Sequence, residues 1–93
     1  MSYVHVTRTP GAGLADYRKV VHELGTEPIA GQVSTHVGVV DGALVVVDLW
    51  ETRADADRFA AERLFPAFER AEFRLHEATD VIAFEPVVDA VPA

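Results

Sequence analysis

The chain of 93 residues is long enough for one domain, which we expect to span residues 1–93, because domains cluster around ~100–150 residues. A net charge of -7 excludes a protein that reads the phosphate backbone of nucleic acids, and the absence of cysteine excludes disulfides and thiolate-ligated metals. Although 49% of the residues are hydrophobic, the longest apolar run is Ala43–Val47, far short of the ~20 residues of a membrane span, and no signal-peptide pattern is present, so we expect a cytoplasmic protein.

The N-terminal part of the chain predicts a strand followed by a helix. Residues Tyr3–Arg8 alternate between apolar and polar side chains, as in a half-buried strand, and Thr9–Gly13 breaks the pattern. Apolar residues then recur at helical spacing over Leu14–Leu24. Gly25 follows as a C-terminal stop.

The middle of the chain predicts a β-hairpin. Gln32–Val40 and Ala43–Trp50 are rich in β-branched residues, and only Asp41-Gly42 separates them. This pair closes a right-twisted hairpin because both positions tolerate positive φ.

The C-terminal part predicts a second helix and a last strand. Thr52 caps a helix that runs to Ala71, and Pro66 should kink or restart it. Val81–Val88 then reads as a strand that Pro86 assigns to a sheet edge. The βαββαβ order predicts an α+β, ferredoxin-like fold in which a four-stranded antiparallel sheet carries two helices on one face, with the first strand between the third and fourth.

The strand Ala43–Trp50 is largely apolar on both faces. Two helices cover one side of a sheet, so the other side would leave several hundred Å² of apolar surface in water, which soluble monomers rarely tolerate. We therefore predict a C2 homodimer in which two sheets pack face to face.

Polar and aromatic residues alternate along the strands at positions that we expect on one interior face: Tyr3, His5, Thr7, Ser34, His36, Asp48, Trp50 and Glu85. Imidazoles and carboxylates beside an indole suit proton transfer from a small aromatic or enolisable substrate. We predict His36 as the base and Asp48 as the group that orients a histidine, with His5 as the second imidazole. The substrate-binding residues would be Trp50, Glu85 and the helix side chains of Tyr17, Phe59, Phe65 and Phe68. The alternative is that buried histidine and aspartate only satisfy one another.

Two other kinds of site find little support. His5 and His36 with a carboxylate would form a two-histidine metal face, but no HxH or HxxxH spacing is present, and no metal is predicted. Gly11-Ala12-Gly13 lacks the third glycine and the Lys-Ser/Thr pair of a phosphate-binding loop and reads as a turn.

The strand end Asp48-Leu49-Trp50-Glu51 with its capped helix, the run Gly31–His36 and the C-terminal strand VIAFEPVVDAV resemble the antibiotic biosynthesis monooxygenase superfamily of dimeric α+β barrels. Within it, the chain is similar to small actinobacterial proteins of unassigned function. The resemblance implies a homodimer, a pocket between sheet and helices and, from the anthrone-oxidising members, no organic cofactor.

Two activities of this superfamily match the chain only in part. The axial histidine of the haem-degrading members has no counterpart in Phe65–Phe68, and His5 stands nearest to their first-strand asparagine. Haem degradation is therefore disfavoured. Of the Asn, Trp and Tyr set of the anthrone oxidases, Trp50 is represented.

Two functional hypotheses follow. The first is a cofactor-free enzyme, either a monooxygenase or an isomerase or cyclase, that acts on an aromatic or polyketide-type substrate. The alternative is a non-catalytic dimeric protein that binds a small ligand or has a structural role.

Overall fold

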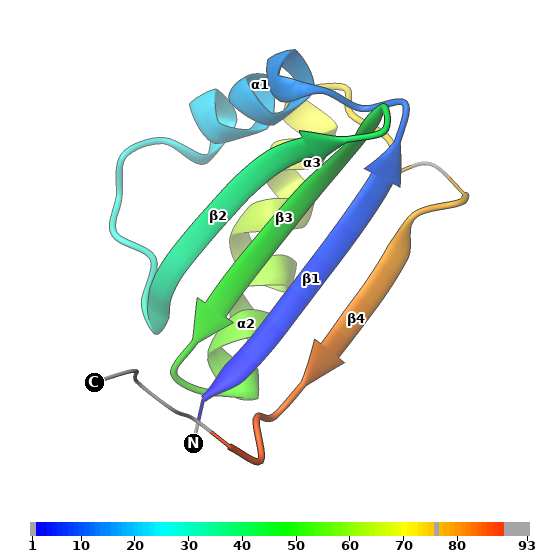
Figure 1. Cartoon of the computed structure of the whole chain (residues 1–93). Coiled ribbons are helices and arrows are strands. Elements are labelled where there is room, and N and C mark those ends of the chain that lie inside the picture. Colours follow the sequence, from blue (N-terminus) through cyan, green and yellow to red (C-terminus); the bar gives the residue numbers. More distant parts are fainter. Residues whose placement is uncertain (1, 76, 89–93) are drawn as a thin grey trace.

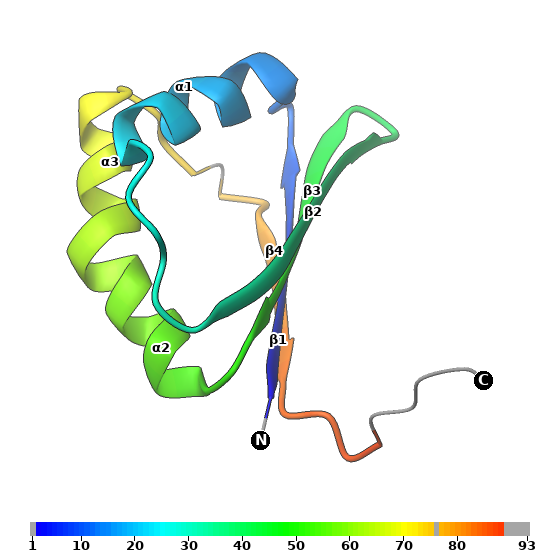
Figure 2. The same ribbon diagram turned by 90° about the vertical axis from the view of Figure 1, so that its left-hand side faces the viewer.

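A four-stranded antiparallel sheet with the strand order β2-β3-β1-β4 organises the computed structural model, which describes residues 2–75 and 77–88 (Figure 1). The strands are β1 (Tyr3–Pro10), β2 (Gln32–Val40), β3 (Ala43–Trp50) and β4 (Asp80–Phe84). The helices are α1 (Leu14–Leu24), α2 (Arg53–Phe59), the π-helical turn η1 (Ala60–Leu64) and α3 (Phe65–Arg70). All of them lie on one side of the sheet (Figure 2), and the predicted βαββαβ order is confirmed.

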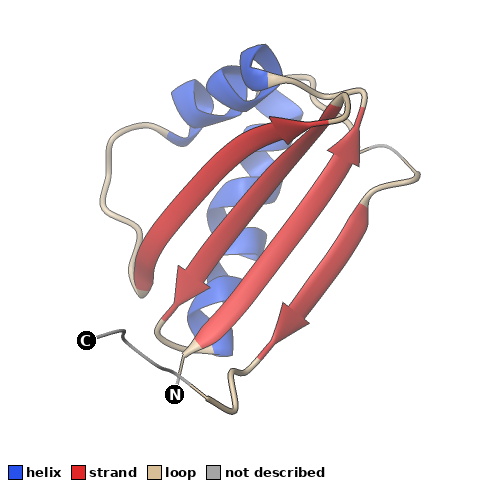
Figure 3. Cartoon of the chain, viewed as in Figure 1, coloured by secondary structure: helices blue, strands red, loops and turns tan. Residues whose placement is uncertain are grey.

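The β2–β3 hairpin has the predicted two-residue turn, which is visible at one end of the sheet in Figure 3. Asp41 and Gly42 both adopt positive φ, 48° and 73°, and Val40 pairs with Ala43 across the turn. Such a turn matches the right-handed twist of the two strands. Because its length is fixed, the turn also fixes which residues of β2 and β3 lie opposite one another.

Thr52 begins α2 as predicted, and its hydroxyl oxygen accepts a hydrogen bond from the backbone N–H of Asp55 at 3.1 Å. Pro66 has no N–H to donate to the preceding turn, so the α-helical pattern is interrupted there. The helix widens into η1, where the N–H of Phe65 donates to the carbonyl of Ala60, and α3 restarts with Pro66 in its first turn.

The last strand is shorter than the sequence predicts. β4 ends at Phe84, so the predicted extent Val81–Val88 is wrong. Glu85 and Pro86 lie outside the sheet, because proline cannot donate a ladder hydrogen bond and favours an exit from the strand.

The core lies toward the two ends of the sheet. At one end Trp50, 2% exposed, packs with Tyr3 and Ala56, and its ring lies 5.2 Å from that of Phe59. At the other end the buried residues include Ala43, Leu44, Thr9, Ala12 and Val20. The inward side chains of the sheet between these ends are only partly buried.

Two arginines join the helices to each other. The Arg63 guanidinium donates to the carbonyls of Leu24, Glu27 and Pro28 at 3.0 to 3.3 Å. Arg70 donates to the carbonyl of Glu23 at 2.9 Å and pairs with its carboxylate at 3.3 Å. These bonds satisfy carbonyls at and beyond the C-terminal end of α1 that have no partner within the helix.

Replacing Arg63 by methionine should lower the free energy of unfolding by about 1–2 kcal/mol, because several carbonyls lose a charged donor. The change is measured by urea denaturation. Arg53→Met is the matched control, since the Arg53 side chain is 68% exposed and, among the described residues, pairs only with Asp57 at i,i+4. Its expected cost is about 0.5 kcal/mol or less. Equal costs for the two variants would contradict the role given to Arg63.

No other element of the described chain lies over the sheet face away from the helices (Figure 2), and most of its side chains are apolar. The strand registers place these side chains on it: Val4, Val6, Val40, Val45, Val47, Leu49, Ile82 and Phe84. Three of them are strongly exposed, Val40 at 55%, Ile82 at 61% and Phe84 at 48%.

Candidate functional site

A row of residues crosses the middle of the sheet on its helix-facing side. Asp48 of β3 lies between Thr35 of β2 and His5 of β1, and Ala83 of β4 follows His5. Directly opposed residues of antiparallel strands project from the same face, with Cβ atoms ~5 Å apart. The sheet therefore brings a carboxylate, an imidazole and a hydroxyl together, and the predicted grouping of His5 with Asp48 is present.

One hydrogen bond joins two members of this row. The Thr35 hydroxyl donates to Oδ1 of Asp48 at 2.8 Å. Burial raises the pKa of Asp48, while the Thr35 bond and the charges of His5 and His36 act in the opposite direction. The Asp48 carboxyl is thus biased toward the protonated form by its surroundings.

Tyr17 of α1 lies close enough to this row to interact electrostatically with Asp48. Burial raises the pKa of its phenol, and the negative charge of Asp48 raises it further. The phenol therefore keeps its proton near neutral pH and can donate a hydrogen bond.

The space around the row is not closed by side-chain packing. His5, Thr35, Asp48 and Tyr17 are all half-buried although they lie between the two layers. In a filled two-layer core, inward side chains in the middle of a sheet would be buried. These four residues therefore keep part of their surface in contact with solvent.

Aromatic side chains of α3 and of the segment after it supply apolar surface. Phe68 lies 6.1 Å from Phe65 and 5.2 Å from Phe73, measured between ring centroids, and Phe65 is 52% exposed. The Phe59 ring packs against Trp50 and is therefore not part of this apolar surface.

The predicted common face is wrong for part of β2. His36 lies opposite Val47 and Ser34 opposite Leu49, so both side chains project from the open apolar face. The His36 Nε2 atom lies 3.3 Å from the Ser34 hydroxyl there. The reason is the hairpin register, which gives the inward position beside Asp48 to Thr35 instead.

Two further predicted residues are placed differently from expectation. Glu85 is exposed beyond the end of β4 and is not part of the row. Trp50 is on the inward face, but with 2% exposure its ring is part of the core and offers no free face to a ligand.

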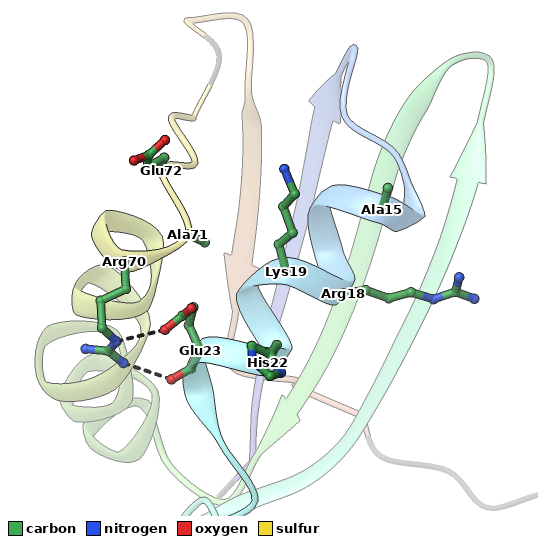
Figure 4. Close-up of a pocket in the computed structure, with 8 residues that line it drawn as sticks. All are labelled: Ala15, Arg18, Lys19, His22, Glu23, Arg70, Ala71 and Glu72. Carbon is green, nitrogen blue, oxygen red and sulfur yellow. Dashed lines mark hydrogen bonds and ion pairs between the residues drawn. The ribbon is translucent and has the colours of Figure 1, made fainter.

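Two surface clefts lie elsewhere. One, of about 490 Å³, runs along α1 and α3, where the long side chains of Arg18 and Lys19 diverge and Arg70 is bound to Glu23 (Figure 4). The other, of about 500 Å³, lies where the β1–α1 loop, Pro10–Ala12, meets Glu72–Leu75. Asp48, His5 and Thr35 line neither cleft.

Among the described residues, no group of three or more His, Cys, Asp or Glu side chains is arranged to hold a metal ion. None of the helices of residues 2–75 and 77–88 is long and apolar enough to span a membrane.

Thr35 is the site residue that sequence reasoning missed. The predicted two-residue turn already pairs Val40 with Ala43, and counting back from it pairs Thr35 with Asp48. The hairpin signal could therefore have found this contact, whereas assigning polar residues of different strands to one face by their own alternation could not.

Comparison with known proteins gives a fold and no sequence relative. No protein-family model matches the chain, and no curated protein matches it. Solved structures do match over nearly the whole chain, and several are described as antibiotic biosynthesis monooxygenases. The predicted α+β, ferredoxin-like fold is thereby confirmed.

Three of these structures illustrate the likeness. Rv0793 from Mycobacterium tuberculosis has a TM-score of 0.74 at 13% identity and covers 98% of this chain and 100% of its own. SnoaB, a cofactor-independent oxygenase from Streptomyces nogalater, has a TM-score of 0.71 at 13% identity, with coverages of 99% and 98%. The ActVA-Orf6 monooxygenase of Streptomyces coelicolor, solved in complex with the ligand nanaomycin D, has a TM-score of 0.67 at 21% identity, with coverages of 99% and 93%.

Proposed function

We propose that this protein is a homodimeric, cofactor-independent oxygenase that acts on an enolisable phenolic aromatic bound between the sheet and the helices. Asp48 removes a proton from the substrate, His5 lies beside it as the second polar group, and the Tyr17 phenol donates a hydrogen bond to a substrate oxygen. Phe68, with Phe65, contributes the apolar wall for the ring.

The observation that carries this proposal is the half-buried Asp48, whose carboxylate is held by Thr35 in the middle of the inward face. A general base is most effective when its pKa lies closer to the working pH, and burial moves the pKa of Asp48 in that direction. Similarity of fold to SnoaB and to ActVA-Orf6 supports the choice of oxygenation over other uses of a carbanion.

The reaction balances without a further reductant. Removal of one methylene proton from an anthrone-type substrate leaves an electron-rich enolate, which transfers electrons to molecular oxygen. Two C–H bonds are broken and one C=O bond is formed in the product, and the second oxygen atom leaves as water. Isomerisation or cyclisation would begin with the same proton removal and would consume no oxygen.

A second copy of this chain is the proposed cover for the open sheet face. This face carries large apolar side chains that are strongly exposed, Val40 at 55%, Ile82 at 61% and Phe84 at 48%, and contiguous exposed apolar surface is typical of an interface. The apolar side chains of this face would then be removed from water, which favours association.

Oxygen uptake with dithranol, a dihydroxyanthrone, tests the proposed activity. The purified protein, treated with a chelator, should consume one oxygen molecule for each anthrone converted to the quinone, above the rate without protein. Thermal stabilisation by dithranol without turnover would instead support a non-catalytic binding protein. A protein that neither turns over nor binds dithranol or nanaomycin D would contradict the proposal.

A further inference from the structure

We infer that Thr35 is a positioning residue for Asp48: its hydroxyl fixes the carboxylate so that Oδ2 faces the substrate. This inference rests on the proposed function, because it assigns a role at the same site. It concerns a residue whose side chain was not expected to take part, and it follows from the hairpin register and one hydrogen bond.

The β2–β3 hairpin delivers Thr35 to Asp48. The turn at Asp41 and Gly42 sets the register in which the two residues are opposed on the inward face. A β-bulge at Val33, between Gln32 and Ser34, ends this register just beyond Thr35. Bulges next to active sites commonly set the direction of a side chain. Here the regular pairing of β2 with β3 continues through the Thr35–Asp48 pair and is interrupted only after it.

The hydrogen bond constrains one of the two carboxylate oxygens. The Thr35 hydroxyl engages Oδ1 at 2.8 Å, the usual length of a strong O–H···O bond. Threonine is β-branched and therefore stiff at χ1, so its hydroxyl stays directed at Asp48. Because Oδ1 already accepts from Thr35, we assign the substrate proton to the other carboxylate oxygen, Oδ2.

The hydrogen bond from Thr35 also lowers the pKa of Asp48 and so opposes the effect of burial. A hydrogen bond to the charged form favours that form, so Thr35 keeps the carboxylate ionised at a lower pH than burial alone would allow. The titratable groups that influence Asp48 are His5 from β1 and His36 on the opposite face of β2, and Asp48 in turn raises the pKa of Tyr17 from α1. None of these is changed when Thr35 is replaced by valine, which has nearly the same shape and no hydroxyl.

The test is a pH titration of the Asp48 carboxyl in the full chain, monitored by carbon-13 NMR of labelled aspartate. Three proteins are compared: the unchanged chain, Thr35→Val and Thr35→Ser. The valine variant should titrate at higher pH than the unchanged chain, because the stabilising donor is lost. The serine variant should titrate close to the unchanged chain, because it restores the donor.

Two results would overturn the inference. One is a Thr35→Val titration that coincides with that of the unchanged chain. The other is a Thr35→Ser titration displaced as far as that of Thr35→Val, which would assign the effect to packing. Should Thr35→Val fail to fold by circular dichroism, the serine variant and Thr35→Ala carry the same comparison.

The kinetic readout separates this inference from the proposed function. If the chain oxidises dithranol, the acid limb of the pH-rate profile should move to higher pH in Thr35→Val and return in Thr35→Ser. A displaced titration together with no turnover in the unchanged chain would contradict the oxygenase and leave the Thr35 contact established. Turnover with an unmoved acid limb in Thr35→Val would contradict the positioning role and leave the oxygenase.

Discussion

Ile82→Glu should convert the protein from a dimer of about twice the chain mass to a monomer, as measured by size-exclusion chromatography with light scattering. Ile82 is 61% exposed on the open face of β4, so glutamate in its place remains solvated in the monomer. In the proposed interface the same carboxylate would be buried among apolar side chains without a partner, which costs several kcal/mol. The monomer should still show the circular dichroism spectrum of the folded chain.

Val81→Glu is the control for this experiment. Val81 precedes Ile82 in the same edge strand and is 58% exposed, but it projects from the helix-facing side of the sheet. This variant should remain dimeric. An unchanged molecular mass for Ile82→Glu would show that the open face is not the interface, and a monomeric Val81→Glu would show that the effect of Ile82→Glu is not specific to that face.

Asp48→Asn should lower the turnover of dithranol by ~10²–10⁴-fold, the usual contribution of a general base. Asparagine keeps an acceptor oxygen for the Thr35 hydroxyl and nearly the same shape, so the loss reports on proton removal and not on packing. Initial rates of oxygen uptake at saturating substrate measure it. Asp57→Asn, which neutralises an exposed carboxylate on α2, should retain full activity.

Asp48→Asn should also change the stability of the protein. Because burial raises the pKa of Asp48 in the folded state, the native state of the unchanged chain holds this proton more tightly than the unfolded chain does. The stability that the protonated group contributes is present below its unfolded pKa of ~3.9 and is lost as the pH rises through the folded value. Asp48→Asn should therefore be more stable than the unchanged chain at pH 7, and the difference should shrink toward acid pH.

We therefore expect the unchanged chain to be more active and less stable than Asp48→Asn. This relation is typical of a functional site, where a buried charge is kept for its chemistry. If Asp48→Asn lost activity and stability together at pH 7, the carboxylate would be a structural group.

The local signals of the sequence were sufficient for the elements and their order. The Asp41-Gly42 turn and the Thr52 cap each act within a few residues, and both occur in the structure as predicted. The extent of β4 was not predictable from alternation, since Val87 and Val88 continue the apolar pattern while lying outside the sheet. Strand pairing and the exit at Pro86 decide where that strand ends.

Alternation along each strand grouped the site residues correctly only where it agrees with the pairing register of the strands. His5 and Asp48 were grouped correctly because alternation within β1 and β3 happens to agree with their register. His36 was grouped wrongly because alternation within one strand does not say which of its faces is inward. Trp50 shows a different limit: its position on the inward face was predictable, but its burial by Tyr3 and Phe59 depends on packing that no strand pattern encodes.

Hydrogen exchange at the methylene carbon of an anthrone, measured by proton NMR in deuterated buffer without oxygen, tests proton removal by Asp48 most directly. The exchange requires neither oxygen chemistry nor product release, so it isolates the step assigned to this carboxylate. We expect the unchanged chain to accelerate exchange above the rate in buffer, and Asp48→Asn to reduce it to the buffer rate. Equal acceleration by the two proteins would contradict the assignment of Asp48 as the base.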